Sequence, residues 1–283
     1  MTLHEVLASA RGRLVAAGIA ADEAAIDVDV YARTILGWDR ARLLTEQQAP
    51  VPPALEPRFS GFMARREQKE PTAYIIGVRE FWGLDFEVSP AVLIPRPESE
   101  FIVEEALARL DGLGSPRIAD VGTGSGCIGV AIAHTTPGAR VIATDISGDA
   151  LQVARRNAAR HRVTDRVEFV ETSYLEGVTG PFDAVVSNPP YVKECDRKHT
   201  QRAVMRYEPH VALFGGDDGL SGVRAVLDGA LTRLTPGGWV IFEFGLGQDD
   251  EIAELVGGYP EYRLTGIRND LQGIPRTALV QRT

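Results

Sequence analysis

The segment Asn188-Pro189-Pro190-Tyr191 holds the residue types and spacing best suited to chemistry in this chain of 283 residues. It follows an apolar run, 182–187, that is typical of a buried strand. Two successive prolines fix φ and keep the residue before them extended, so Asn188 is held rigidly at the strand end. A planar NH₂ group there could donate to the Asn188 side-chain oxygen and to the Pro189 carbonyl, with Tyr191 stacked against it. We therefore predict that these four residues bind a planar amide or amine.

The chemistry that this segment favours is methylation of a nitrogen atom. An amide or exocyclic amine nitrogen is a poor nucleophile because its lone pair is delocalised. Two acceptors out of its plane would favour a tetrahedral nitrogen and aim the lone pair at a methyl carbon, by positioning and electrostatic preorganisation. The catalytic residues are then expected to be Asn188, Pro189 and Tyr191. The alternative without chemistry is a rigid proline turn in which Asn188 is a local cap.

The elements that must position this segment belong to an α/β fold. From residue 117 onward, short strands alternate with helices, as in a parallel sheet with helices on both faces. The last two strands have no convincing helix between them and would form a closing antiparallel pair. The expected strands are 117–121, 140–144, 167–170, 182–187, 239–244, 262–267 and 278–281. Because such a sheet binds ligands beyond the carboxyl ends of its strands, the loops there are the candidate sites.

A glycine-rich loop, 122–126, directly follows the first of these strands. Glycine adopts positive φ at no steric cost and lets backbone approach a ligand closely. Cys127 occupies the third glycine position of the dinucleotide fingerprint, and the Lys of a P-loop is missing. A compact G-x-G-x-G loop suits a ligand without a pyrophosphate, such as S-adenosylmethionine. The expected cofactor-binding residues are Gly122, Thr123, Gly124, Ser125 and Gly126. The alternative is that the loop binds no ligand and is an ordinary tight turn between a strand and a helix.

Two later strand ends extend this cofactor site. Asp145 ends the second strand, where an acid can accept hydrogen bonds from both hydroxyls of a ribose. Ser173 and Tyr174 follow the third strand, where the edge of an adenine is expected. Tyr174 could cover a face of the base, although packing in the protein explains a tyrosine there equally well.

The part of the chain before the sheet divides into a helical region and a connection. Residues 1–70 are expected to form a small helical bundle, with a capping box at Thr2 and Glu5. Residues 71–95 contain two short strand patterns around Gly83 and are expected to form a β-hairpin that joins the bundle to a domain at 96–283. The bundle carries no recognisable chemistry, so we expect it to recognise a protein substrate.

Composition narrows the class of protein. The net charge of -9 and the pI near 5.2 disfavour a nucleic-acid substrate. No apolar run approaches the roughly 18 residues that span a bilayer, and the first residues do not form a secretion signal, so a cytoplasmic protein is expected. Cys127 and Cys195 lie far apart without close histidines, which supports neither a disulfide framework nor a zinc site.

In its Asn188-Pro189-Pro190-Tyr191 segment the sequence resembles the class I methyltransferases of the Asn-Pro-Pro-Tyr type, whose members methylate adenine, guanine or glutamine nitrogens. It is more similar to the bacterial release factor glutamine methyltransferases, over nearly the whole chain. The stretches that carry this resemblance are Pro71-Thr72-Ala73-Tyr74-Ile75, Glu80-Phe81-Trp82-Gly83-Leu84, Ile94-Pro95-Arg96-Pro97-Glu98-Ser99-Glu100, Tyr207-Glu208-Pro209, Gly216-Asp217-Asp218-Gly219-Leu220 and Asp270-Leu271-Gln272-Gly273-Ile274-Pro275-Arg276.

The resemblance implies a Rossmann-like, seven-stranded methyltransferase domain behind a helical N-terminal domain. It implies that residues 122–126, Asp145 and Asn188 bind S-adenosylmethionine. It also implies that residues 188–191 hold the glutamine of the Gly-Gly-Gln loop in class I peptide chain release factors. Ser99 replaces the usual Thr of the family and keeps the hydroxyl. Ser173-Tyr174 replaces an acidic residue followed by Trp or Leu, which leaves the adenine contacts open.

Three other functions compete with this interpretation. The nearest is a glutamine methyltransferase of a large-subunit ribosomal protein, whose family typically has Pro-Arg-Ser-Pro where this chain has Pro95-Arg96-Pro97-Glu98. An adenine-N6 methyltransferase of DNA or RNA is disfavoured by the acidic charge and by the lack of a basic stretch interleaved with aromatic residues. A non-catalytic protein that binds S-adenosylmethionine is disfavoured by the intact segment at Asn188.

Overall fold

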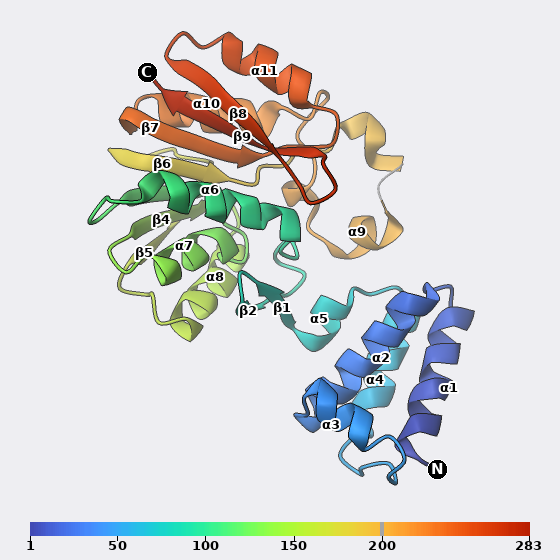
Figure 1. Ribbon diagram of the computed structural model, residues 1–283. Helices are drawn as coiled ribbons and strands as arrows, with labels where there is room; N and C mark the ends of the chain where they lie inside the picture. Colours follow the sequence, from blue (N-terminus) through green and yellow to red (C-terminus); the bar gives the residue numbers. More distant parts are fainter. Residues whose placement is uncertain (199–200) are drawn as a thin grey trace. The chain divides into compact units, whose positions relative to one another are not determined.

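The computed structural model describes residues 1–198 and 201–283 and divides into two compact units, Met1–Val78 and Arg79–Thr283 (Figure 1). No helix in these described ranges is long and apolar enough to cross a membrane. The first unit is helical, and the second contains the large sheet.

The first unit consists of helices around one apolar core. They are α1 Leu3–Ala16, α2 Ala21–Leu36, α3 Arg40–Thr45, α4 Arg58–Glu67 and α5 Thr72–Ile76. The predicted capping box starts α1: Thr2 Oγ1 accepts from the Glu5 amide at 3.3 Å, and the Thr2 amide donates to Glu5 Oε2 at 2.8 Å. At the end of α2, Gly37 has a φ of 65°, which glycine adopts without strain and which stops the helix. Every helix of the unit contributes to the core, and the loop residues Ile19 and Leu55 are also part of it. The buried side chains from the helices include Leu7, Leu14, Val28, Tyr31, Leu43, Phe59, Met63 and Ile75.

A buried ion pair crosses this bundle. Arg66 Nε of α4 lies 2.7 Å from Asp27 Oδ2 of α2, and both side chains are only 6% exposed. The other oxygen of Asp27 accepts from the hydroxyl of Thr72, which in turn contacts the Tyr31 hydroxyl. Removing Arg66 would take away the cation that pairs with the buried Asp27 carboxylate, so this network holds α2 against α4 and α5.

The predicted β-hairpin is present. It consists of β1 Val78–Phe81 and β2 Leu84–Glu87, joined by a two-residue turn at Trp82 and Gly83. Both turn residues have positive φ, 57° and 70°, as a tight hairpin turn requires. In the second unit β2 packs on helix α8, Gly148–Arg160, where the side-chain amide of Asn157 bonds to both the amide and the carbonyl of Glu87.

The second unit is built on a seven-stranded sheet with the order β5-β4-β3-β6-β7-β9-β8. Strands β3 to β7 pair in parallel, and β9 pairs antiparallel to both β7 and β8, which confirms the predicted α/β fold and its closing pair. The bounds of the strands are β3 Arg117–Val121, β4 Arg140–Asp145, β5 Val167–Glu171, β6 Phe182–Ser187, β7 Leu234–Glu243, β8 Tyr262–Asn269 and β9 Pro275–Arg282.

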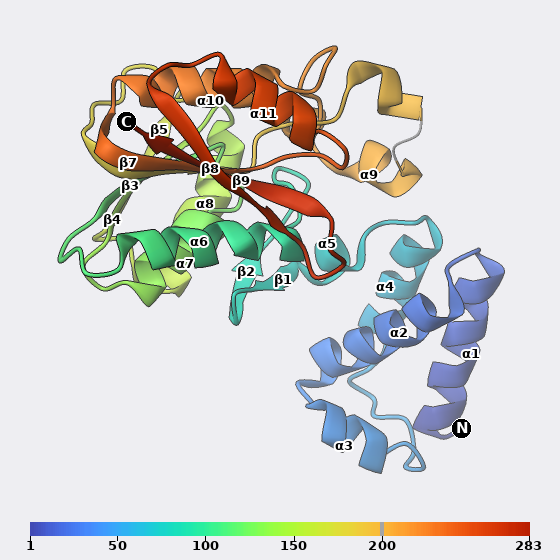
Figure 2. The same cartoon turned by 45° about the horizontal axis from the view of Figure 1, so that its top comes forward.

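Helices cover both faces of this sheet (Figures 1 and 2). One face packs against α6 Glu100–Leu110, α7 Cys127–Thr135 and α8, through Val103, Ala106, Val130 and Ala158. The other packs against α10 Ser221–Leu231 and α11 Asp249–Gly257, through Val223, Leu227, Ile252 and Val256. A short helix, α9 Arg202–Tyr207, lies in the long connection between β6 and α10. The central strands β3 and β6 are buried on both faces and are mainly apolar, whereas the edge strands β5 and β8 are partly exposed and carry charged residues.

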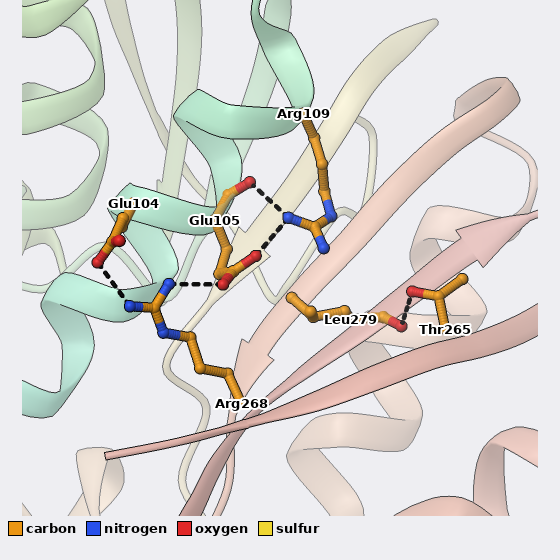
Figure 3. Close-up of polar contacts among 6 residues, drawn as sticks. All are labelled: Glu104, Glu105, Arg109, Thr265, Arg268 and Leu279. Carbon is orange, nitrogen blue, oxygen red and sulfur yellow. Dashed lines mark hydrogen bonds and ion pairs between the residues drawn. The ribbon is translucent and has the colours of Figure 1, made fainter. Parts of the chain in front are cut away.

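An ion-pair cluster anchors α6 to the edge strand β8 (Figure 3). Arg268 of β8 reaches Glu104 at 2.8 Å and Glu105 at 2.6 Å, and Arg109 pairs with Glu105 from one helical turn further along. The hydroxyl of Thr265 donates to the Leu279 carbonyl at 2.9 Å and holds β8 on β9. This cluster fixes α6, the helix that begins directly after Ser99.

Candidate active site

The glycine loop follows β3 as predicted and turns the chain into α7. Gly122, Gly124 and Gly126 all have positive φ, at 70°, 55° and 83°. Among the described residues, no atom lies within 4 Å of where a Cβ would stand at Gly122 or Gly124, whereas a Cβ at Gly126 would come within 3.1 Å of Ala154 Cβ. Two glycines therefore leave room for a ligand, and the third lets α8 pack closely.

A buried carboxylate that the sequence reasoning missed holds this loop. Asp120 Oδ2 accepts from the Thr123 hydroxyl at 2.6 Å and from the Gly129 amide at 2.9 Å. Burial raises the pKa of Asp120 to about 6, against the effect of these two hydrogen bonds, and Asp145 adds to the rise. The sequence did hold a sign of this role, because Asp120 is an acid near the end of an otherwise apolar strand, just before the glycine loop.

Asp145 lies across from the loop at the end of β4. Its Oδ2 accepts from the Gly124 amide and its Oδ1 from the Ser147 amide, each at 2.9 Å. Burial raises the pKa of Asp145, while these backbone amides act against the rise. Each carboxylate oxygen keeps a second lone pair, so the side chain can still accept from hydroxyls of a ligand.

These residues line a pocket that opens to solvent. The predicted site residues on its wall are Gly122, Thr123, Gly124, Ser125, Asp145, Ser173, Tyr174, Asn188 and Pro190. Gly126, Pro189 and Tyr191 are predicted site residues that do not line it. Tyr174 has a φ of 49°, a strained value for a residue with a Cβ and one that is often found at functional sites.

The Asn188 segment is fixed to its surroundings on both sides. The hydroxyl of Ser187 donates to the Val121 carbonyl at 2.8 Å, which ties the end of β6 to the start of the glycine loop. On the other side, a Cβ at Gly215 would stand 2.3 Å from the Pro190 carbonyl oxygen, and one at Gly222 would be 3.0 Å from Pro189 Cβ. The glycines after the segment therefore let the chain pack directly on the two prolines.

A second buried carboxylate lies behind Asn188. Asn188 Nδ2 donates to Ser99 Oγ at 2.9 Å, and the Ser99 hydroxyl donates to Glu243 Oε2 at 2.6 Å. The Tyr191 hydroxyl donates to the other oxygen of Glu243 at 3.1 Å. The hydroxyl of Tyr191 thus points into the protein, and the carboxylate of Glu243 raises the pKa of this phenol, with burial acting in the same direction.

One wall of the pocket is formed by segments far apart in the chain. Glu208 is buried and accepts from the Ile94 amide at 3.2 Å and from Arg96 Nη2 at 2.7 Å. Arg96 and Pro209 both line the pocket. This ion pair therefore holds the chain before α6 beside the chain after α9.

The roles of Ser99, Glu208 and Glu243 were not anticipated from the sequence. Ser99 and Glu208 lie in stretches that carry the family resemblance, but their spacing in the sequence did not indicate their hydrogen-bond partners. Glu243 gave one signal: it is a charged residue at the end of an apolar strand, as Asp120 is. Burying a charge in that position costs free energy unless the charge is hydrogen-bonded, so a charged residue there indicates specific hydrogen-bond partners.

Comparisons with known proteins identify related families and a shared fold. Residues 99–209 match the family described as methyltransferase small domain, and residues 5–77 match the one described as PrmC N-terminal domain. A solved methyltransferase from Pyrococcus furiosus is 24% identical and superposes with a TM-score of 0.53 over 79% of this chain and 98% of its own, which shows the shared fold.

Relatives in bacteria match nearly the whole chain. A release factor glutamine methyltransferase of Bradyrhizobium diazoefficiens is 42% identical over 90% of this chain and 87% of its own. One of Koribacter versatilis is 38% identical over 99% of this chain and 98% of its own. The similarity thus includes both compact units.

Proposed function

This chain belongs to the release factor glutamine methyltransferase family, and we propose that it methylates the side-chain amide nitrogen of the glutamine in the Gly-Gly-Gln motif of a class I peptide chain release factor. The methyl donor is S-adenosylmethionine. The observation that carries this proposal is that Asn188 lines the same pocket as the glycine loop and Asp145. A planar amide can thus lie against Asn188 beside a cofactor on the loop.

The residues at the glycine loop fit this cofactor. The open space at Gly122 and Gly124 allows close approach of a ligand to the backbone. Asp145 has free lone pairs for the two ribose hydroxyls, and Tyr174 lies on the pocket wall as a candidate cover for the adenine. When bound, S-adenosylmethionine supplies an electrophilic methyl group.

The residues of the Asn188 segment orient the glutamine. The side-chain oxygen of Asn188 and the carbonyl of Pro189 each accept a hydrogen bond from the NH₂ group of the substrate amide. Two fixed acceptors hold the nitrogen in place and favour the geometry in which its lone pair is available. Pro190 lines the pocket, and Tyr191 packs behind the segment with its hydroxyl on Glu243. The segment thus contributes position and electrostatics and contains no strong general base. The amide nitrogen loses one proton during or after methyl transfer, to the solvent to which the pocket opens.

Three parts of the chain divide the work in this proposal. Residues 96–283 bind cofactor and carry out methyl transfer, the hairpin within 71–95 connects them to the bundle, and residues 1–70 recognise the body of the release factor. A release factor substrate would place the reaction in the cytoplasm. The net charge of -9 suits a protein substrate better than free nucleic acid.

Methyl transfer from labelled S-adenosylmethionine tests this proposal when purified release factor, ribosomal protein, protein-free rRNA and DNA are offered side by side. Label in the release factor alone is the expected result. Label in the ribosomal protein or in nucleic acid, with none in the release factor, would contradict it.

A further inference from the structure

The carboxylate of Glu243 joins two residues of the Asn188 segment without being part of it. Glu243 ends β7 and is 2% exposed, and Ser99, which precedes α6, is 2% exposed. Glu243 accepts from Ser99 Oγ at 2.6 Å and from the Tyr191 hydroxyl at 3.1 Å. Ser99 Oγ in turn accepts from Asn188 Nδ2 at 2.9 Å. The order of groups is therefore carboxylate, hydroxyl, side-chain amide.

The direction of the protons in this row follows from the chemistry of its first member. An ionised carboxylate only accepts hydrogen bonds, and a hydroxyl has a single proton to donate. Once the Ser99 hydroxyl donates its single hydrogen bond to Glu243, only its lone pairs remain to face Asn188. Asn188 must then turn its NH₂ toward Ser99, which leaves its Oδ1 on the opposite side of the amide group.

The other orientation of Asn188 would oppose the reaction. With the amide turned over, its NH₂ would meet the NH₂ of the substrate, and two donors would face each other. With Oδ1 in that position, Asn188 presents an acceptor. The two orientations have the same shape, so packing alone discriminates poorly between them. Discrimination needs a hydrogen-bond partner of fixed polarity.

We propose that Glu243 is a positioning residue that sets, through Ser99, which side of the Asn188 amide faces the substrate. The same carboxylate fixes Tyr191 through its hydroxyl. This inference rests on the proposed function, because it assigns Asn188 the task of accepting from the glutamine amide. Glu243 does not touch the substrate; it acts through Ser99.

Ser99 and Tyr191 place one hydroxyl donor at each carboxylate oxygen of Glu243. Burial raises its pKa, and the hydrogen bonds donated by Ser99 and Tyr191 act against that rise. Among charged neighbours, Glu98 also raises the pKa of Glu243, while Arg276 lowers it. Tyr191 keeps its proton, because the nearby carboxylate raises the pKa of the phenol. Both donors to Glu243 are thus hydroxyls that remain protonated.

The activity test uses the full-length enzyme and four variants. Ser99→Ala should lower kcat about tenfold, while KM for the release factor and Kd for the cofactor stay within about threefold. Ser99→Thr keeps the hydroxyl and should stay within about threefold of the parent kcat. In an Asn188→Ala background, Ser99→Ala should change kcat by less than about twofold, because Ser99 acts only through Asn188. An equal loss in both backgrounds would show a merely structural role and overturn the proposal.

The second readout does not need the substrate. In a ¹⁵N-labelled protein, the side-chain amide signals of Asn188 are those missing from Asn188→Ala. They should shift in Ser99→Ala and in Glu243→Met, which removes the acceptor, and stay near their parent positions in Ser99→Thr. Unchanged signals in Ser99→Ala would contradict the inference even if Glu243→Met failed to fold. If the parent enzyme left release factor unmethylated while these shifts occurred, the proposed substrate would fail and the hydrogen-bond assignment would stand.

Discussion

The hydroxyl of Ser187 donates to the carbonyl of Val121 at 2.8 Å and so joins the two strand ends from which the glycine loop and the Asn188 segment start. Ser187 is only 1% exposed. Ser187→Ala would leave a buried carbonyl with one partner fewer, so it should lower the free energy of unfolding by about 1–3 kcal/mol. Urea denaturation measures this. Ser115→Ala is the matched control, because its exposed hydroxyl also bonds to a carbonyl, that of Gly138, yet its loss should cost under about 0.5 kcal/mol.

Asp145 is predicted to hold the ribose of the cofactor. Asp145→Ala removes a charged acceptor and should weaken cofactor binding by about 2–3 kcal/mol in isothermal titration calorimetry. Asp149→Ala removes an exposed acid of the same region, in the first turn of α8, and should bind the cofactor as the parent does. Unchanged affinity in folded Asp145→Ala would remove Asp145 from the site.

Asp120 gives a pH dependence of stability with a defined sign. Its pKa is raised from 3.8 to about 6 in the folded protein, so the native state binds its proton more tightly than the unfolded chain does. The resulting stability is complete below the unfolded pKa and is lost as the pH rises through about 6. A rise of about two pKa units corresponds to about 3 kcal/mol.

Asp120→Asn tests this, because asparagine keeps an acceptor for Thr123 and Gly129 but does not titrate. The free energy of unfolding of the parent, minus that of the variant, should fall between about pH 4 and pH 7. Denaturant titrations across that range measure the difference. A difference that stays flat or rises with pH would show that Asp120 ionises in the folded protein as readily as in the unfolded chain.

The strands were predicted well because each is a short apolar run bounded by turn residues. The bounds of β3 and β6 agree with 117–121 and 182–187, and the closing antiparallel pair is confirmed. Strand β7 was predicted to begin at Trp239 but begins at Leu234, because Leu234 already pairs with Phe182 of β6 and the pairing resumes at Trp239 after an irregularity in register that includes Pro236 and Gly237. Such residues normally end a strand, so local pattern could not show this.

The site was predictable only where neighbours in sequence act together. The glycine loop and the Asn188 segment are contiguous, and their place at strand ends followed from the fold class. Ser99, Asn188 and Glu243 lie in three separate parts of the chain, and only the tertiary structure brings them together. Tyr191 was expected to stack on the substrate; the structure places its hydroxyl on Glu243, a partner that no local pattern indicated.

The proposed role of the helical unit is tested with a chain that begins at Arg79, the first residue of the second compact unit. Cofactor affinity should be retained, because the glycine loop, Asp145 and Asn188 all lie beyond that point. The kcat/KM for an intact release factor should fall, while that for a short Gly-Gly-Gln peptide should not. A folded truncated enzyme that methylates the intact factor at the parent rate would rule out a recognition role.

Asn188 is predicted to act mainly in the transition state. Asn188→Ala removes the proposed acceptor for the substrate amide and should lower kcat by on the order of a hundredfold, with a smaller change in KM for the release factor. Asn188→Asp keeps the shape and an acceptor, but it adds a charge beside the Pro189 carbonyl. Near-normal kcat with only a raised KM in Asn188→Ala would instead mean uniform binding of substrate and transition state.

The methyl acceptor in the proposed reaction is a glutamine side chain of a release factor. This is tested most directly by a fragmentation mass spectrum of the Gly-Gly-Gln peptide, recorded after the release factor has been incubated with enzyme and S-adenosylmethionine. The expected spectrum shows one added methyl group on the glutamine side chain, and about a hundredfold less of it when Asn188→Ala replaces the enzyme for the same short time. An unmodified peptide after incubation with active parent enzyme, or a methyl group on another residue, would contradict it.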